Sequence, residues 1–121
     1  METKLNDLLE FFSENPHRWC QFTRAKNFNG IPVSVDDYGA VQWCLEGGID
    51  YLRLGFKDIQ YLERAASKII ADDDKLKKIH GSYHYGCPPI SFVNDDTNFT
   101  TVIKLIKDAI DLMNLEKEIN T

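Results

Sequence analysis

The segment FTTVIKLIKDAIDLM, residues 99–113, carries the clearest periodic pattern in the chain. Its apolar side chains recur every three or four positions, which is the spacing that lines one face of an α-helix. The stripe consists of Phe99, Val102, Ile103, Ile106, Ala109, Ile110 and Met113. Thr97, Asn98 or Thr100 can cap the start of this helix. The pattern therefore predicts a long amphipathic helix that buries one face in the core.

The same periodicity predicts further helices upstream. They are expected over residues 4–14, 35–46 and about 50–70, followed by a short turn that begins near residue 74. Ser34 and Asp37 form a variant of the capping box at the start of the second helix. Gly47-Gly48 is typical of the left-handed stop at a helix end. The wide apolar surface between these two signals predicts a central helix that is buried on most sides.

Two short segments favour extended structure. The segment WCQFTRA, residues 19–25, brings aromatic and β-branched side chains, and Asn29-Gly30 favours a tight turn after it. Pro32 restricts the returning arm to a sheet edge, so a small hairpin or an irregular loop with the same turn is expected. The run ISFV, residues 90–93, predicts a short buried strand.

The length and composition are those of a single soluble domain. The chain has 121 residues, of which 43% are hydrophobic and 27% are charged, and a chain of this size can bury a core without disulfides or metals. We therefore expect a mainly α (α+β) fold, with about four helices and a small β hairpin or short sheet, in one compact domain over residues 1–121. No cofactor is expected.

The charge balance bears on the partners of the chain. The net charge is −5, from 14 basic and 19 acidic residues, and no basic stripe or tail is present. Direct nucleic-acid binding is therefore not expected, whereas an acidic surface suits docking onto a basic protein. The start of the chain lacks the form of a signal peptide, and no apolar run is long enough to span a bilayer. Together with three cysteines in no spacing framework, these features predict a cytoplasmic protein that does not enter a membrane.

The loop HGSYHYGC contains a candidate metal-binding set. His80, His84 and Cys87 lie within eight residues, and imidazole and thiolate are ligands that suit zinc. A closed zinc site needs a fourth ligand and usually a Cys-x-x-Cys pair, which the sequence lacks. The favoured interpretation is a solvated loop whose tyrosines pack on the body of the domain.

The segment NDDTN, which follows the expected strand, is the second candidate site. Part of it matches the first ligand positions of a calcium-binding loop, but Thr101 and Lys107 stand where that loop requires a glycine and a bidentate glutamate. A looser magnesium site built on Asp95 and Asp96 is compatible with the sequence. The favoured interpretation is an Asx-type turn between strand and helix, in which Asn94 or Asp95 bonds the local backbone.

A cationic, aromatic-rich patch is expected around the hairpin, formed by Arg18, Trp19, Gln21, Phe22, Arg24 and Lys26. Its candidate binding residues are Arg18, Trp19, Phe22 and Arg24. Arginine and aromatic residues are enriched at binding hot spots, and the same residues can pack a hairpin with their polar heads in water. We favour the structural use, and the patch is the best surface candidate for a protein partner.

Cys44 is expected in mid-helix as a small core residue. No nucleophile elbow, phosphate-binding loop, HExxH or CxxC motif occurs, which argues against the commonest enzyme classes.

Two blocks of the chain, residues 18–49 and 90–110, share a combination of short motifs. A Trp precedes a Gly-hydrophobic turn, an expected helix bears Ala-x-x-Trp-Cys-x-x-Gly, and an expected strand runs into Asn-Asp ahead of the last helix. The residues involved are Trp19, Gly30, Ala40, Trp43, Cys44, Gly47, Asn94 and Asp95. This combination resembles a family of small bacterial and phage proteins with a domain of unknown function, although Gly48 stands where the family more often has alanine. The resemblance covers nearly half of the chain and implies a compact α-rich domain in a phage or mobile-element setting.

These patterns lead to two hypotheses for function. The leading one is a non-enzymatic protein-interaction module, such as a phage- or mobile-element-encoded modulator or inhibitor of a host protein. The alternative is a small metal-assisted or acid–base enzyme centred on the Asn94-Asp95-Asp96 turn, with His80 or His84 supplying a titrating group. The alternative requires these side chains to converge on an open cleft.

Overall fold

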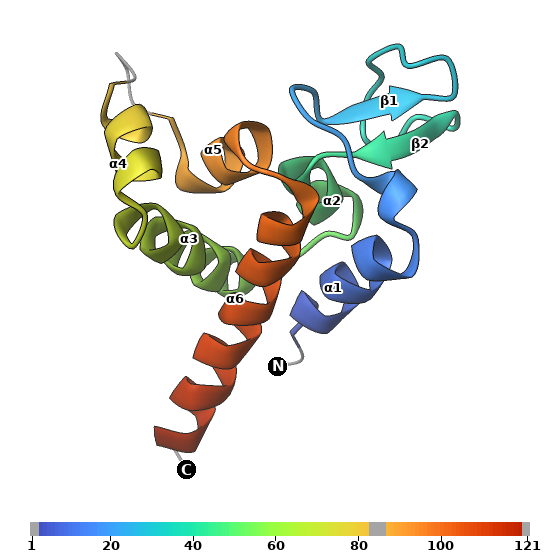
Figure 1. Cartoon of the computed structure of the whole chain (residues 1–121). Helices are drawn as coiled ribbons and strands as arrows, with labels where there is room; N and C mark the ends of the chain where they lie inside the picture. The colour runs from blue at the N-terminus through green and yellow to red at the C-terminus, as the bar shows by residue number, and fades with distance from the viewer. Residues whose placement is uncertain (1–2, 83–86, 120–121) are drawn as a thin grey trace.

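The computed structural model describes residues 3–82 and 87–119 of the chain (Figure 1). Within these ranges it contains six α-helices, one short 3-10 helix and a two-stranded antiparallel sheet. In chain order the elements are α1 (Leu5–Glu14), η1 (Pro16–Arg18), β1 (Ala25–Asn27), β2 (Ala40–Trp43), α2 (Leu45–Tyr51), α3 (Phe56–Ala71), α4 (Asp74–Gly81), α5 (Pro89–Asp96) and α6 (Phe99–Ile119). The mainly helical fold with a small β element and the short helix near residue 74 are confirmed. The expected number of about four helices is too low.

The longest helix, α6, forms the centre of the core. Figure 1 shows it running along the molecule, with α3 on one side and α1 on the other. Its buried residues are Val102, Leu105, Ile106, Ala109 and Met113. Removing each large aliphatic side chain from water contributes about 1.5–3 kcal/mol, so this face supplies much of the stability. The helix predicted from the apolar stripe is therefore confirmed.

The helix predicted over residues 35–46 is wrong, because this segment forms a turn and a strand. The Asp37 side chain accepts a hydrogen bond from the Gly39 N–H at 2.8 Å, and its carbonyl oxygen accepts from the Ala40 N–H at 3.0 Å. Aspartate followed closely by glycine favours such turns. β2 follows directly and buries Trp43, whose indole N–H donates back across the turn.

Gly47 and Gly48 lie inside α2, so the predicted helix stop is also wrong. A Cβ atom on Gly47 would overlap the carbonyl oxygen of Arg24, and one on Gly48 would lie 2.8 Å from the ring of Phe12. The two glycines therefore allow α2 to approach the start of β1 and the face of α1 closely. This packing outweighs the helix-propensity cost of about 1 kcal/mol per glycine.

The helix predicted over residues 50–70 is divided in the structure. The backbone of Arg53 takes a left-handed φ of 58° after α2, and α3 begins after Gly55. The buried carboxylate of Asp58 stabilises this boundary, because it accepts from the Gly55 N–H at 3.3 Å and from the Thr3 hydroxyl at 2.5 Å. The glycine thus marks a boundary between two helices.

The strand predicted over residues 90–93 is wrong, because this run lies within α5. Pro89 occupies the first helical position, where its missing N–H and fixed φ suit a helix start. A short apolar run cannot by itself distinguish a buried helix from a buried strand. In the helix, Asn94 follows the buried Phe92 and Val93 into the interior. The Asn-Asp pair therefore closes α5 and does not join a strand to a helix.

The sheet pairs β1 with a segment that the sequence pattern predicts to be helical. β1 pairs with β2 in the register Ala25↔Trp43, Lys26↔Gln42 and Asn27↔Ala40. The predicted turn at Asn29-Gly30 is present, with a φ of +77° at Gly30, and a single bridge from Lys26 to Pro32 closes it. The returning arm of the expected hairpin is therefore minimal, and the main partner of β1 is the segment that was expected to be helical.

Candidate functional site

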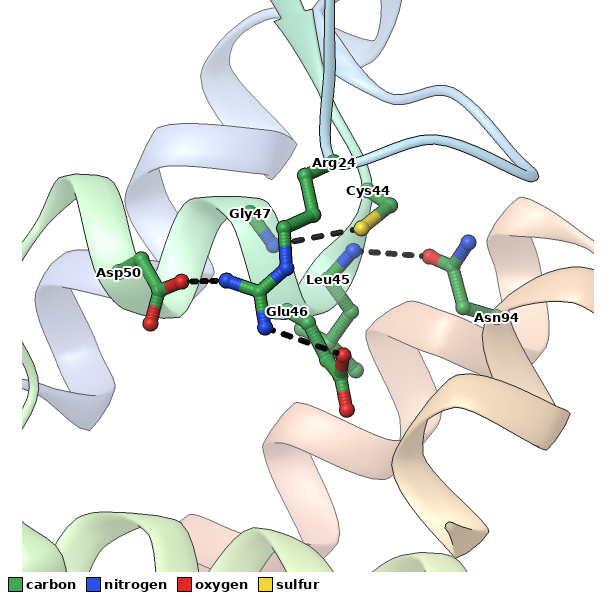
Figure 2. Close-up of polar contacts among 7 residues, drawn as sticks. All are labelled: Arg24, Cys44, Leu45, Glu46, Gly47, Asp50 and Asn94. Carbon is green, nitrogen blue, oxygen red and sulfur yellow. Dashed lines mark hydrogen bonds and ion pairs between the residues drawn. The ribbon is translucent and has the colours of Figure 1, made fainter. Parts of the chain in front are cut away.

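The side chain of Asn94 joins three segments of the chain. It is almost completely buried, at 1% exposure. Its Oδ1 atom accepts from the Trp19 indole N–H at 2.6 Å and from the Leu45 backbone N–H at 2.9 Å, the contact drawn in Figure 2. Its Nδ2 atom donates to the Cys20 carbonyl oxygen at 3.2 Å and to the Asp95 carboxylate at 2.9 Å. These four bonds use the full capacity of the amide.

Asp95 and Gln21 attach the end of α5 to the segment before β1. Asp95 Oδ1 accepts from the Phe22 backbone N–H at 2.9 Å. Gln21 Nε2 donates to the carbonyl oxygens of Asn94, Asp95 and Thr97 at 3.1 to 3.2 Å. Carbonyl groups at the end of a helix lack helical partners, so Gln21 acts as a cap. In place of the predicted Asx-type turn, Asn94 and Asp95 bond to backbone more than 70 residues away in sequence.

Arg24 lies beside this junction and contacts two acids of α2. Figure 2 shows its guanidinium between the carboxylates of Asp50 and Glu46, the latter with an Nη2–Oε2 distance of 3.7 Å. The Arg24 side chain is 58% exposed, so water screens each pair and its contribution to stability is at most about 1 kcal/mol. The Arg24 carbonyl oxygen accepts from the Cys44 N–H at 3.1 Å, which continues the pairing of the two strands.

A cavity of about 160 Å³ opens where these segments meet. Its lining residues are Phe22, Thr23, Arg24, Cys44, Glu46, Ser91, Asn94 and Asp95. We call this space the α5 cavity. It brings together sequence candidates that were assigned to separate sites, namely the basic patch, the cysteine motif and the Asn-Asp pair. Its polar groups can bind a small charged group, but the lining holds no histidine.

The thiols beside the cavity are protonated at neutral pH. Burial, with a smaller effect from neighbouring Cys44, raises the pKa of Cys20 to about 11. Burial also raises the pKa of Cys44, although the Gly47 N–H, 3.2 Å from its Sγ, opposes this rise. A cysteine nucleophile requires a thiolate. Cys44 is buried as expected but serves as the cap of α2 and not as a mid-helix residue.

The four candidate binding residues of the predicted patch lie in different environments and make different contacts. Arg18 lies 4.9 Å from the centre of the Phe11 ring and donates to the Phe11 carbonyl oxygen. Trp19 is half-buried and directs its indole N–H into the interior. Phe22 is exposed and lines the α5 cavity together with Arg24. The first two residues therefore stabilise the fold, and the other two border the cavity.

The candidate metal loop is described only in part. His80 lies in α4, where its Nε2 atom is 2.7 Å from the Cys87 carbonyl oxygen and its ring packs against Phe92. His84 lies outside the described residues. Asp96 is exposed and does not line the α5 cavity. In the described parts of the chain, no group of three or more His, Cys, Asp or Glu residues is placed to hold a metal ion.

Sequence reasoning missed Gln21, Glu46 and Ser91 as neighbours of the Asn-Asp pair. No local signal marks Gln21, because the helix end that it caps lies more than 70 residues away. Glu46 was assigned to the end of a helix that does not form. Phe22 adopts a φ of 70°, and a bulky residue rarely takes this conformation, so no pattern could indicate it.

No protein-family model, curated protein or solved structure matches this chain. The resemblance of the two sequence blocks to a bacterial and phage family therefore stays a prediction. Across the residues described, no helix is both long enough and apolar enough to cross a membrane.

Proposed function

We propose that this chain is a non-enzymatic protein-binding module that docks a basic protein partner. The observation that carries the proposal is a set of large apolar side chains exposed around the two-stranded sheet. This set, which we call the sheet surface, comprises Phe28, Ile31, Tyr38 and Val41. Single exposed apolar residues are ordinary on soluble proteins, whereas a group of them on a small surface is typical of an interface.

The backbone beneath the sheet surface is well fixed. The tight turn at Gly30 and the turn at Asp37 each close with backbone hydrogen bonds, and β1 pairs with β2 between them. A surface that is ordered before binding loses less conformational entropy when a partner docks. Aromatic side chains on such a scaffold supply large contact areas with few rotatable bonds.

A groove of about 360 Å³ lies beside this surface. Its lining residues are Asn15, His17, Asn27, Phe28, Val41 and Gln42. It therefore combines two members of the sheet surface with three side-chain amides. Interfaces commonly place hydrogen-bonding groups at the rim of an apolar centre, and this groove has that composition.

The charge of the chain supports a basic partner. A net charge of −5 favours the approach of a positively charged surface and disfavours an acidic one. The resemblance to bacterial and phage proteins adds the expectation that the partner is a host protein whose activity this chain modulates or inhibits. We place this role in the cytoplasm, because the three cysteines are free thiols, and free thiols are typical of reducing compartments.

The test is co-purification of a tagged chain from a native lysate, followed by reconstitution with the purified partner. The double variant Phe28→Ser/Tyr38→Ser is expected to lose a stoichiometric partner that the wild type retains. Phe56→Ser is the matched control, because Phe56 is an equally exposed phenylalanine at the start of α3. Absence of any stoichiometric partner, or equal retention by the double variant, would overturn the proposal.

A further inference from the structure

The charged groups that line the α5 cavity favour the binding of a cation. Its lining contains one guanidinium, from Arg24, and two carboxylates, from Glu46 and Asp95, which gives a formal charge of −1. Asp50, which does not line the cavity, also pairs with Arg24 and offsets the charge of its guanidinium. The remaining lining groups are neutral. An anion would therefore meet repulsion here, and a cation would meet attraction.

Asp95 offers an unused oxygen to this cavity. Both of its hydrogen bonds, from the Phe22 N–H and from Asn94 Nδ2, end on Oδ1. Within the described residues, Oδ2 has no hydrogen-bond partner. The side chain is half-buried and lines the cavity, so the carboxylate as a whole is only partly exposed to water. A carboxylate in this state binds a cationic donor more strongly than a fully hydrated one.

The Glu46 side chain lines the same cavity, and its carboxylate can accept further hydrogen bonds. Its contact with Arg24 is long, at 3.7 Å, and Arg24 makes a closer pair with Asp50. Arg24 therefore engages the Glu46 carboxylate only weakly, and a second cation can approach this carboxylate without breaking the closer pair between Arg24 and Asp50. Ser91, half-buried on α5, adds a hydroxyl to the lining.

Phe22 provides an aromatic wall at the edge of the cavity. Its side chain is 77% exposed although its backbone is strained, with a φ of 70°. A conformation of this kind is unfavourable for a bulky residue, and the hydrogen bond from the Phe22 N–H to Asp95 holds it in place. The fold thus maintains an exposed ring beside two carboxylates, and a cation near the face of such a ring is stabilised by its π electrons.

We propose that the α5 cavity binds the guanidinium group of an arginine side chain on the basic protein partner. This inference rests on the proposed function and names the group that the partner presents. A guanidinium is planar, so it can stack on the Phe22 ring while its edge donates to Asp95 Oδ2 and Glu46. The rounder ammonium of lysine matches this arrangement less well, because it lacks a flat face and a fork of parallel donors.

The test is a titration of the isotope-labelled full chain by NMR with the blocked amino acid N-acetyl-arginine methylamide. Saturable shifts are expected at the backbone amides of Phe22, Glu46 and Asp95, and they should weaken as salt is added. The matched probe is N-acetyl-citrulline methylamide, which has nearly the same shape without the charge. Equal shifts with citrulline, or no saturable shift with arginine, would overturn the proposal.

Three variants locate the binding. Glu46→Gln and Asp95→Asn should each weaken the arginine probe about tenfold, because each removes one charge-assisted contact. Asp95→Asn retains an oxygen that can accept from the Phe22 N–H, and the NMR spectrum itself reports whether the fold is kept. Glu63→Gln, an exposed change of the same charge on α3, should leave binding unchanged. Equal weakening in all three variants would assign the binding to general surface charge and overturn the cavity assignment.

The two proposals can fail separately. A partner that depends on Phe28 and Tyr38 but is indifferent to Glu46→Gln, together with a silent arginine titration, would overturn the arginine site and support the module. A saturable arginine titration at the cavity, without any stoichiometric partner, would support the site and overturn the module.

Discussion

At the scale of single residues, the buried amide of Asn94 is predicted to make a large contribution to stability. Replacing it with alanine leaves the Trp19 indole N–H, the Leu45 N–H and the Cys20 carbonyl without their partner in a buried place. Such unsatisfied groups cost about 1–3 kcal/mol each when water cannot reach them. Asn94→Ala is therefore expected to lower the free energy of unfolding by at least about 3 kcal/mol in urea titrations.

The matched control for this change is Asn114→Ala, which alters an exposed asparagine of α6. It should change the free energy of unfolding by less than about 0.5 kcal/mol. A loss in Asn94→Ala no greater than in the control would mean that water replaces the amide, and the role of Asn94 as the junction of three segments would be wrong.

The raised pKa of Cys20 predicts that the stability of the fold changes at high pH. Its pKa is raised from the ordinary value of 9.0 to about 11 by burial, so the folded chain holds a proton that the unfolded chain releases first. This contribution to stability is fully present below pH 9 and is lost as the pH rises toward 11. The advantage of the wild type over Cys20→Ala should fall by at most about 1.4 kcal/mol per pH unit across this window.

The measurement compares denaturant unfolding of the two proteins at several pH values from 8 to about 11. Taking the difference removes the contribution of lysines, which titrate in both chains. A difference that stays constant with pH would show that the Cys20 thiol is not desolvated in the folded chain.

The candidate site shows which residue roles can be predicted from the sequence and which cannot. The choice of Asn94 and Asp95 as notable residues came from their types and from the family resemblance, and both do occupy the junction of three segments. Their partners are distant in sequence, however, so neither the bonds to the segment before β1 nor the cavity could be predicted. The sequence shows that a side-chain amide can form several hydrogen bonds, but it does not show which backbone groups will be its partners.

At the scale of elements, the cap on α5 is a contact that can be tested in isolation. Gln21 Nε2 lies within hydrogen-bond distance of three carbonyl oxygens at the end of this helix and can share its two N–H groups among them. Among the described residues, no other side chain bonds the Asn94 or Asp95 carbonyl. Gln21→Ala is therefore expected to lower hydrogen-exchange protection in α5 about tenfold, while protection in α6 stays close to that of the wild type. The measurement is amide hydrogen exchange under native conditions.

Gln60→Ala serves as the control, because Gln60 is an exposed glutamine on α3. Protection in α5 should be the same in this variant as in the wild type. Equal loss of protection across all helices in Gln21→Ala would indicate a global effect and contradict a local cap.

The errors in element prediction have a common physical cause. The run over residues 90–93 is short and apolar, whereas the segment over residues 35–46 mixes apolar residues with turn-forming residues such as Asp37 and Gly39, and both patterns fit two kinds of element. Tertiary packing decides between them. Gly47 must approach the Arg24 carbonyl closely, so the helix begins only at Leu45 and not near residue 35. Pro89 suits a helix start, so residues 90–93 lie in a helix. The long stripe over residues 99–113 was predictable because it repeats over several turns.

At the scale of the whole molecule, the single-domain prediction can be tested by cooperativity. Ile106 is completely buried in α6, so Ile106→Ala should lower the free energy of unfolding by about 2–5 kcal/mol. Both tryptophans lie at or near the sheet, at Trp19 and Trp43. Unfolding followed by tryptophan fluorescence should therefore coincide with unfolding followed by helical circular dichroism, in the wild type and in the variant.

Ile119→Ala is the control, since Ile119 is 73% exposed at the end of the same helix, and it should leave the unfolding midpoint almost unchanged. A fluorescence transition that separates from the circular dichroism transition would mean that the sheet and its neighbours form an independent unit.

The mainly helical class was predictable from composition and periodicity, because these report how much apolar surface each segment must bury. The arrangement of the elements was not, because it depends on contacts between residues far apart. The sheet pairs two segments separated by two turns, and the core joins α1 to α6.

The packing of α1 against α6 has a consequence for synthesis on the ribosome. The two helices begin at Leu5 and Phe99, 94 residues apart, and chains grow at about 5–20 residues per second. The part of the apolar face of α1 that packs on α6 must therefore wait roughly 5–20 s for its partner, although α2, which also packs on α1, is made earlier. During that interval part of this face, which is fully buried in the finished molecule, is exposed to other nascent chains. We expect α1 to be the segment that a ribosome-associated chaperone shields first.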